Sequence, residues 1–114
     1  MNVVRTVPTD SVSEQVHVKR LTDQLGATKL HANAWSLAEG AQMKRHLHRE
    51  QEELYVVLGG DAEIEVDGAT HKLGERDALV APAGATRQIS NVGVGPLTYL
   101  AVSAPPVADD AEMK

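Results

Sequence analysis

The 114-residue sequence contains no cysteine and no phenylalanine, and it has only one tryptophan and two tyrosines. The absence of cysteine excludes disulfide bonds and thiolate chemistry, so a cytoplasmic location is the default expectation. The scarcity of large aromatic side chains means that any core must be built mainly from aliphatic residues. Hydrophobic residues make up 42% of the chain, which is enough for the core of one small domain.

The sequence also lacks a long apolar run and an excess of positive charge. No apolar stretch approaches the roughly 20 residues of a membrane helix, and the polar start of the chain lacks the apolar core of a signal peptide. The net charge of −5, with acidic and basic residues interspersed, argues for solubility and against a nucleic-acid-binding surface. We therefore expect neither a membrane nor a nucleic acid as a partner.

Signals for β-strands recur along most of the chain. Residues 63–66 alternate between glutamate and an apolar residue, so Ile64 and Val66 should face a core. The Asp67-Gly68 pair that follows is typical of a two-residue hairpin turn. Further strands are expected over residues 29–37, 54–58, 77–81, 86–92 and 97–102. The pattern predicts an all-β protein with no second domain.

The two ends of the chain differ from its middle. Residues 1–14 are polar and rich in turn formers, and we expect them to form an N-terminal arm. Residues 15–25 mix helical and strand-like patterns, and we interpret them as a strand because apolar and polar side chains alternate at their start. Residues 15–104 should form the folded domain. A proline pair ends it, and residues 105–114 are expected to be a flexible acidic tail.

One segment concentrates the residues that can carry chemistry. His46 and His48 are two positions apart, so on a strand both imidazoles project from one face, whereas on a helix they would point about 200° apart. Residues 49–52 form a polar turn, and Glu53 follows at the start of an apolar run. A hairpin of this kind can bring Glu53 opposite the two histidines. Two imidazoles and one carboxylate on an inward face suit a divalent transition metal.

Each of these side chains also has a simpler interpretation. A single strand histidine would be better explained as structural, and Glu53 could be a carboxylate at a surface edge. The presence of two histidines on one face beside an acidic hairpin favours metal ligation. Glu50 and Glu52 compete with Glu53, but only Glu53 directly precedes the core strand. The remaining histidines match no ligand spacing: His17, His31 and His71.

With its flanking glycines, this segment resembles the first signature motif of the cupin superfamily. The string runs Gly40, five residues, His46, one residue, His48, four residues, Glu53, six residues and Gly60. The resemblance covers about residues 30–103 and implies a small antiparallel β-barrel, built as a double-sheet jelly roll. It also implies that the histidines and the glutamate ligate one divalent transition metal, Fe, Mn, Ni or Zn, inside the barrel.

The second cupin motif is matched only in part. Pro82, Gly84 and Asn91 are in place, but Arg76 stands where the family has glycine, and Arg87 stands where it has its last metal-ligating histidine. Gly40, Gly60 and Gly84 are interpreted as turn positions where a Cβ atom would clash. Asn91 should satisfy backbone groups at a turn. Arg76 lies in a short loop and is expected to be exposed to solvent.

Arg87 leaves three alternatives open, because a guanidinium neither ligates a metal nor deprotonates in proteins. In the first, His46, His48 and Glu53 hold the metal as a two-histidine, one-carboxylate triad with open positions, which suits Fe(II). In the second, Arg87 pairs with Glu53 and the site has lost its metal. In the third, Arg87 turns outward and is a surface residue, although its even spacing from Asn91 argues against this.

If Arg87 faces the cavity, its guanidinium offers a fork for a carboxylate, a phosphate or an enolate. The ligand would then be a small anion or a metal-chelating keto or hydroxy acid. Gln42 and Lys44 share strand parity with His46, and Tyr55 shares parity with Glu53, so these three side chains are candidates to line the same cavity. Arg87, Gln42 and Tyr55 are the predicted ligand-binding residues.

Three kinds of function fit these residues. The first is a metal-dependent oxygenase or isomerase that acts on a small polar molecule, with no catalytic residue yet identified. The second is a non-catalytic cupin that senses or sequesters a small molecule, with or without a metal. The third is a structural barrel whose site has decayed. Small cupins are commonly dimers, so the resemblance implies a homodimer. A second copy would also cover the open edge of a sheet, which otherwise exposes unpaired backbone groups.

Overall fold

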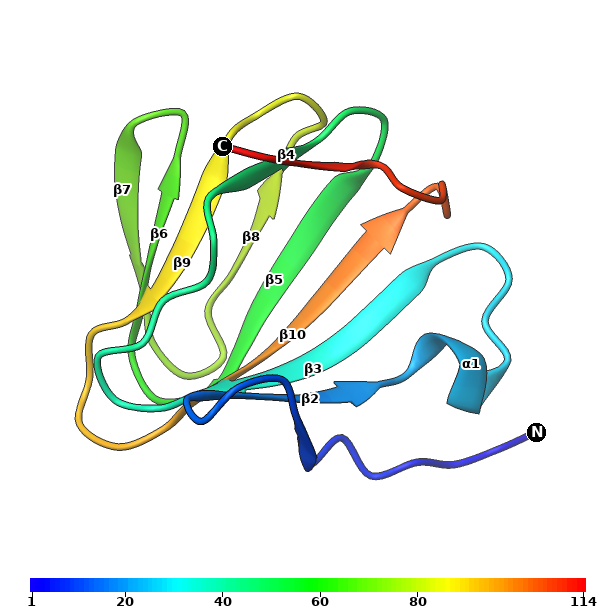
Figure 1. Cartoon of the computed structure of the whole chain (residues 1–114), viewed down its shortest axis with the longest axis horizontal. Coiled ribbons are helices and arrows are strands. Elements are labelled where there is room, and N and C mark those ends of the chain that lie inside the picture. The colour runs from blue at the N-terminus through cyan, green and yellow to red at the C-terminus, as the bar shows by residue number, and fades with distance from the viewer.

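The computed structural model describes residues 1–114 and contains two antiparallel β-sheets that enclose a core between them (Figure 1). The first sheet has six strands, in the spatial order β1 (Asp10–Ser11), β2 (Val16–Arg20), β3 (His31–Leu37), β10 (Leu97–Ala104), β5 (Glu52–Gly59) and β8 (Ala78–Ala81). The second has five, in the order β11 (Ala111–Met113), β4 (His46–His48), β9 (Arg87–Asn91), β6 (Ala62–Val66) and β7 (Ala69–Leu73).

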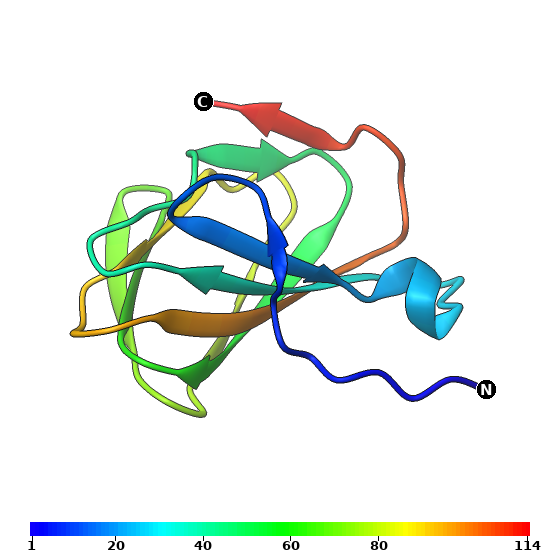
Figure 2. The ribbon, with the colours of Figure 1, turned by 60° about the horizontal axis from the view of Figure 1, so that its bottom comes forward.

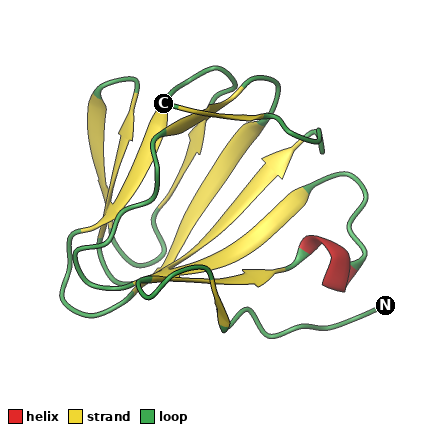
Figure 3. Cartoon of the chain, viewed as in Figure 1, coloured by secondary structure: helices red, strands yellow, loops and turns green.

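Strands dominate the chain, and the one helix is the short α1 (Thr22–Leu25) (Figure 3). The prediction of an all-β protein with the two-sheet architecture of a jelly roll is therefore confirmed. No helix in the structure has the length and apolar character needed to cross a membrane.

Alternation along the strands aims one set of side chains at the space between the sheets. In β10, Leu97, Tyr99, Ala101 and Ser103 are buried, and the residues between them are partly exposed. The main core cluster is aliphatic apart from Tyr55 and Tyr99. Burying each Leu, Val or Ile side chain contributes about 1.5–3 kcal/mol to folding, so this layer is the main source of stability.

Residues 62–73 form the hairpin that the sequence predicts. Ile64 is fully buried, and Val66 packs against the main core cluster. Asp67 and Gly68 have φ angles of 48° and 84°, as a type I′ turn requires at both central residues. This turn matches the twist of β6 and β7, and it fixes their register so that Ile64 faces inward.

Left-handed backbone occurs at four positions of the cupin motifs. Gly60 has a φ of 90°, and a Cβ atom there would lie 2.7 Å from the carbonyl oxygen of Pro96. The predicted clash is wrong for Gly40 and Gly84, where a Cβ atom would meet nothing within 4 Å; their φ angles of 80° and 82° favour glycine instead. Arg76 has a φ of 71°, which is the conformation that glycine adopts most readily. The Arg76 side chain is exposed, as expected, so it makes no clash in the interior. The backbone at Arg76 is nevertheless strained, because a side chain disfavours this φ angle.

Two expectations for the chain ends differ from the structure. The segment 15–25 is a strand only as far as β2, and it then turns into α1, which ends at Gly26 with a φ of 71°. The C-terminal segment is not a detached tail, because β11 pairs with β4 (Figure 2). The acidic composition of residues 105–114 gives no sign of this pairing in the sequence. The pairing is favoured by the open edge of β4 and by one buried carboxylate, Asp110, which accepts backbone hydrogen bonds.

Candidate metal centre

The predicted cluster lies where the two sheets meet. His46 and His48 sit at the two ends of β4 in the five-stranded sheet, and Glu53 is the second residue of β5 in the six-stranded sheet. The turn between these strands brings Glu53 back to the histidines. Glu53 Oε1 lies 3.8 Å from His46 Nε2 and 3.5 Å from His48 Nε2. The three ligand atoms all lie within 4.8 Å of one another.

Both imidazoles are oriented with the same nitrogen toward Glu53. His46 Nδ1 lies 3.1 Å from the carbonyl oxygen of Lys44, which can accept a hydrogen bond from this nitrogen when it carries a proton. His48 Nδ1 faces Asp110 Oδ2 at 3.7 Å. The two rings meet edge to face, with centroids 5.0 Å apart. Each Nε2 therefore faces a common position beside the Glu53 carboxylate.

The donor set and its spacing fit a divalent transition metal. Bonds of about 2.0–2.2 Å to nitrogen and oxygen place neighbouring donors about 3–3.4 Å apart. The two nitrogen-to-oxygen separations given above exceed that spacing by only a few tenths of an ångström. All three side chains are mostly buried, with 19%, 13% and 12% of the His46, His48 and Glu53 side chains exposed. Small rotations would close the set around one ion and leave open positions facing the cavity.

Glu53 is held in its ionised form. Burial raises the pKa of this carboxyl, but contacts with His46 and His48 and a hydrogen bond from Tyr55 outweigh burial, so the pKa lies well below its usual range. Tyr55 donates its hydroxyl proton to Glu53 Oε1. Burial and the charge of Glu53 raise the pKa of Tyr55, so the phenol keeps that proton at neutral pH. Glu53 is therefore available as an anionic ligand throughout the physiological range.

Arg87 points inward and is wholly buried, which excludes the alternative in which it is a surface residue. It lies opposite His46 in the pairing of β4 with β9. Its Nη2 donates to the carbonyl oxygen of Pro82 at 2.9 Å, and its Nη1 lies 3.8 Å from Glu53 Oε1. Nη1 and Nε have no hydrogen-bond partner. The guanidinium thus lies behind Glu53, where it balances the charge of this carboxylate.

A cavity of about 670 Å³ opens in front of the three ligands. Gln42, Lys44 and Tyr55 line it, as the strand parity predicts, whereas Arg87 is not part of its lining. Trp35, Met43 and Tyr99 add an apolar wall. The N-terminal segment and β11 complete the lining with Val12, Val16, Ala111 and Met113. The cavity therefore combines an apolar wall with a polar floor that carries the candidate ligands.

The residues of the second motif support this floor from behind. Gly84, with a φ of 82°, donates its N–H to the carbonyl oxygen of His48 at 2.7 Å. Asn91 is buried and donates to the carbonyl oxygens of Leu37 and Gly95, while its own Oδ1 accepts from Gly93 N. These contacts tie β4 and β9 to the adjacent turns and give the motif residues a structural role.

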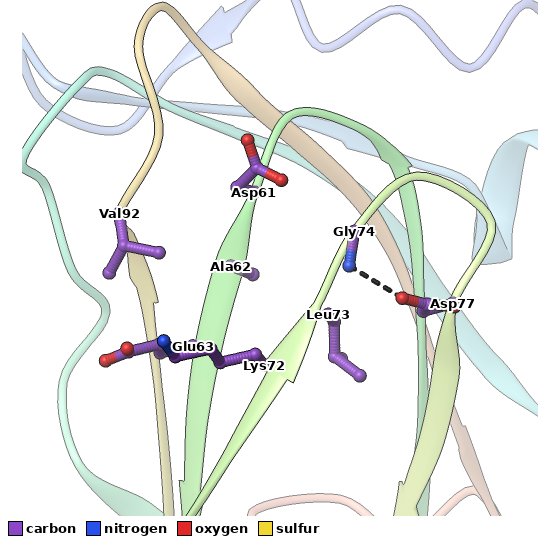
Figure 4. Close-up of a pocket in the computed structure, with 8 residues that line it drawn as sticks. All are labelled: Asp61, Ala62, Glu63, Lys72, Leu73, Gly74, Asp77 and Val92. Atoms are coloured by element: carbon purple, nitrogen blue, oxygen red, sulfur yellow. Dashed lines mark hydrogen bonds between the residues drawn. The ribbon is translucent and has the colours of Figure 1, made fainter.

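A second cavity of about 510 Å³ lies beside the hairpin of β6 and β7 (Figure 4). Asp61, Asp77, Glu63 and Lys72 contribute to its lining. Asp77 Oδ2 accepts a hydrogen bond from Gly74 N at 2.8 Å, so this carboxylate shapes the turn. No histidine reaches this cavity, and the only cluster with metal-ligand geometry is the one at His46, His48 and Glu53.

Asp110 is the residue of the site that the sequence interpretation missed. It is 3% exposed, and its carboxylate accepts hydrogen bonds from the N–H groups of Glu50 and Gln51, the turn between β4 and β5. Burial raises the pKa of Asp110, but the hydrogen bonds from Gln51 and Glu50 and the nearby His48 lower it overall. No local pattern marks this aspartate, because its partners lie about sixty positions earlier in the chain.

Most of the chain matches one known protein family. The family model described as Cupin domain matches residues 33–103. The chain is 32% identical over 89 residues to mannose-1-phosphate guanylyltransferase of Escherichia coli K12, an alignment that covers 78% of the chain but only 16% of that protein. The chain therefore spans about a sixth of the length of this relative, and the same holds for the Salmonella typhimurium enzyme ManC.

Solved structures show the same fold. A predicted oxalate decarboxylase from Thermotoga maritima superposes with a TM-score of 0.80 at 21% identity, covering 92% of this chain and all of the other. A sugar phosphate isomerase of the cupin superfamily from Silicibacter pomeroyi gives 0.76 at 24% identity, over 89% and 76% of the two chains. KdgF from a Halomonas species also gives 0.76, at 21% identity, over 88% and 89%.

Proposed function

Because the chain belongs to the cupin family, we propose that it binds one divalent transition metal through His46 Nε2, His48 Nε2 and the Glu53 carboxylate. The observation that carries this proposal is the convergence of the three donors, whose ligand atoms lie within 4.8 Å of one another at the floor of a cavity. Fe, Mn, Ni and Zn all accept this ligand set, and three protein ligands leave positions open for an exogenous molecule.

The ligand is proposed to be a small polar or anionic molecule that occupies the cavity in front of the metal. A bound metal would supply Lewis-acid polarisation of a carbonyl or carboxylate oxygen. Lys44 at the cavity wall adds a positive charge for an anionic group. The names of two structural neighbours, an oxalate decarboxylase and a sugar phosphate isomerase, fit a ligand of this class. A metal-dependent oxygenase or isomerase is the enzymatic form of the proposal.

A metal-free binding protein is the second candidate, and the position of Arg87 favours it. Its guanidinium lies 3.8 Å from Glu53 and already balances the negative charge of this carboxylate. A metal would need the same negative charge from its carboxylate ligand. A fixed cation close to the ion would also lower the affinity for a dication. In this alternative, the cavity holds a small molecule through Gln42, Lys44 and Tyr55 without any chemistry at the histidines.

Titration with oxalate separates the two candidates. We expect heat of binding from protein reconstituted with Mn²⁺ and at least a tenfold weaker signal from protein treated with a chelator, because the metal provides the anchor. His46→Ala should abolish the difference, while His71→Ala, at an exposed histidine of β7, should keep it. Equal oxalate binding with and without metal would favour the metal-free candidate.

A homodimer is a further part of the proposal. The outer face of β5 and β8 is apolar, with Leu54, Val56 and Val80 partly or fully exposed. On β10, Leu100 and Val102 continue this face, and they also pack against a small buried cluster of Leu21, Ala32 and Ala34. Val3 and Val7 on the N-terminal arm are also exposed. A second copy would cover both surfaces. Sedimentation should give a dimer mass, and a monomer at micromolar concentration would contradict the proposal.

A further inference from the structure

We propose that Asp110, on the C-terminal segment leading into β11, is a positioning residue that fixes the His48 imidazole for metal binding. The inference rests on the proposed metal site, and it assigns a role to a segment that lies outside both cupin motifs. Asp110 is almost completely buried and reaches the site through β11, which pairs with β4 along residues 46–48.

The geometry leaves one partner for the inner nitrogen of His48. His48 Nδ1 is buried and has no hydrogen-bond partner, and the carboxylate of Asp110 lies 3.7 Å away. This gap is roughly 0.8 Å longer than an ordinary N–H···O bond, so a modest ring rotation closes it. A carboxylate only accepts hydrogen bonds. When a metal occupies Nε2, the remaining ring proton lies on Nδ1, where Asp110 can accept its hydrogen bond and hold the ring in the ligating orientation.

Asp110 is itself anchored, so it can direct the ring. Its carboxylate accepts from Glu50 N at 3.0 Å and from Gln51 N at 2.9 Å. These N–H groups belong to the turn that carries the chain from His48 to Glu53. One carboxylate thereby holds both the turn and the ring, and it links two metal ligands to the C-terminal segment. Carboxylates placed in this way behind a ligating histidine typically change metal affinity 10- to 100-fold.

The matched variants are Asp110→Asn and Asp109→Asn. Both remove one negative charge from neighbouring positions, but Asp109 is exposed and has a φ of 54°, which asparagine tolerates. In the wild type, one oxygen, Asp110 Oδ2, both accepts from Gln51 N and faces His48 Nδ1. An asparagine oxygen in its place can still accept from the turn, but it lacks the negative charge that strengthens a hydrogen bond from the ring. Asp110→Asn should therefore keep the turn and hold the His48 imidazole less firmly.

Two measurements decide the proposal. In Zn²⁺-loaded protein, long-range ¹H–¹⁵N spectra should show a His48 Nδ1 proton that exchanges slowly with solvent in the wild type and in Asp109→Asn, and faster in Asp110→Asn. Competition against a chromogenic chelator should show Zn²⁺ affinity 10- to 100-fold weaker in Asp110→Asn alone.

A His48 Nδ1 proton that exchanges freely with solvent in the Zn²⁺-loaded wild type would overturn the proposal, even if Asp110→Asn failed to fold. Weaker Zn²⁺ binding by Asp110→Asn with unchanged exchange of this proton would also overturn it, because it would show a general structural role. A wild type that binds no Zn²⁺ would overturn the proposed function and this inference with it, whereas equal Zn²⁺ affinities in the wild type and Asp110→Asn would overturn the inference alone.

Discussion

Glu53→Ala is expected to lower the free energy of unfolding by about 3–5 kcal/mol in the presence of a chelator. The reason is Arg87, whose side chain is completely buried and whose nearest carboxylate is Glu53. Removing the carboxylate leaves a buried cation without its counter-ion, and two of its nitrogens already lack hydrogen bonds. Urea unfolding of the metal-free protein measures the effect without any contribution from bound metal.

Two controls test this explanation. Glu52→Ala removes an exposed carboxylate from the preceding position of β5 and should change the stability by less than about 0.5 kcal/mol. In a double-mutant cycle with Arg87→Met, the cost of Glu53→Ala should shrink, because the uncompensated charge is gone. A loss below about 1 kcal/mol for Glu53→Ala in the wild-type background would show that Arg87 does not depend on Glu53.

The pH dependence of stability provides a second test of the contacts of Glu53. The pKa of Glu53 is lowered in the folded protein, so its contribution to stability is complete at neutral pH. The contribution is lost progressively as the pH falls below about 4.5, through the lowered folded-state pKa. Glu53→Ala should therefore flatten the acid limb of the stability profile relative to that of the wild type.

Arg87→His is expected to raise the affinity for Zn²⁺ at least tenfold. The substitution removes a cation close to the site, and it places an imidazole at a position that lies directly opposite His46 in the sheet. A fourth donor in addition to the triad completes the tetrahedral set that Zn²⁺ prefers. Competition with a chelator of known affinity measures the change, and the buried histidine should appear as a third metal-shifted imidazole signal, beside those of His46 and His48.

The matched control is Arg49→His, which makes the same change in the exposed turn between β4 and β5. It should leave Zn²⁺ affinity unchanged, because its side chain lies outside the cavity. Unchanged or weaker Zn²⁺ binding by Arg87→His, with the fold intact, would show that position 87 does not face the metal. The prediction that position 87 can supply a fourth metal ligand would then be wrong.

Local sequence patterns were sufficient to predict the centre of the site. The two-residue spacing of His46 and His48 and the short turn before Glu53 are properties of one hairpin, so the period of a β-strand brings them together. The same period places Arg87, Ile89 and Asn91 on the buried face of β9. Inward orientation of the arginine therefore followed from its spacing to Asn91.

The remainder of the site depends on contacts between distant segments. Asp110 meets the turn at Glu50 and Gln51 only after β11 has paired with β4, and neither a short acidic segment nor a proline pair indicates this pairing. The location of Arg87 behind Glu53, outside the cavity lining, also depends on packing. Strand parity specifies the face on which a side chain lies, but not the depth at which its charged group ends.

The metal content of the native protein, purified without a histidine tag, tests the central claim most directly. Elemental mass spectrometry should find close to one Fe, Mn, Ni or Zn per chain, and the His46→Ala/His48→Ala variant should contain none. Absence of metal from the wild type, even after reconstitution with each of these ions, would contradict the account. It would mean that Arg87 alone balances Glu53 and that the cavity binds its ligand without a metal.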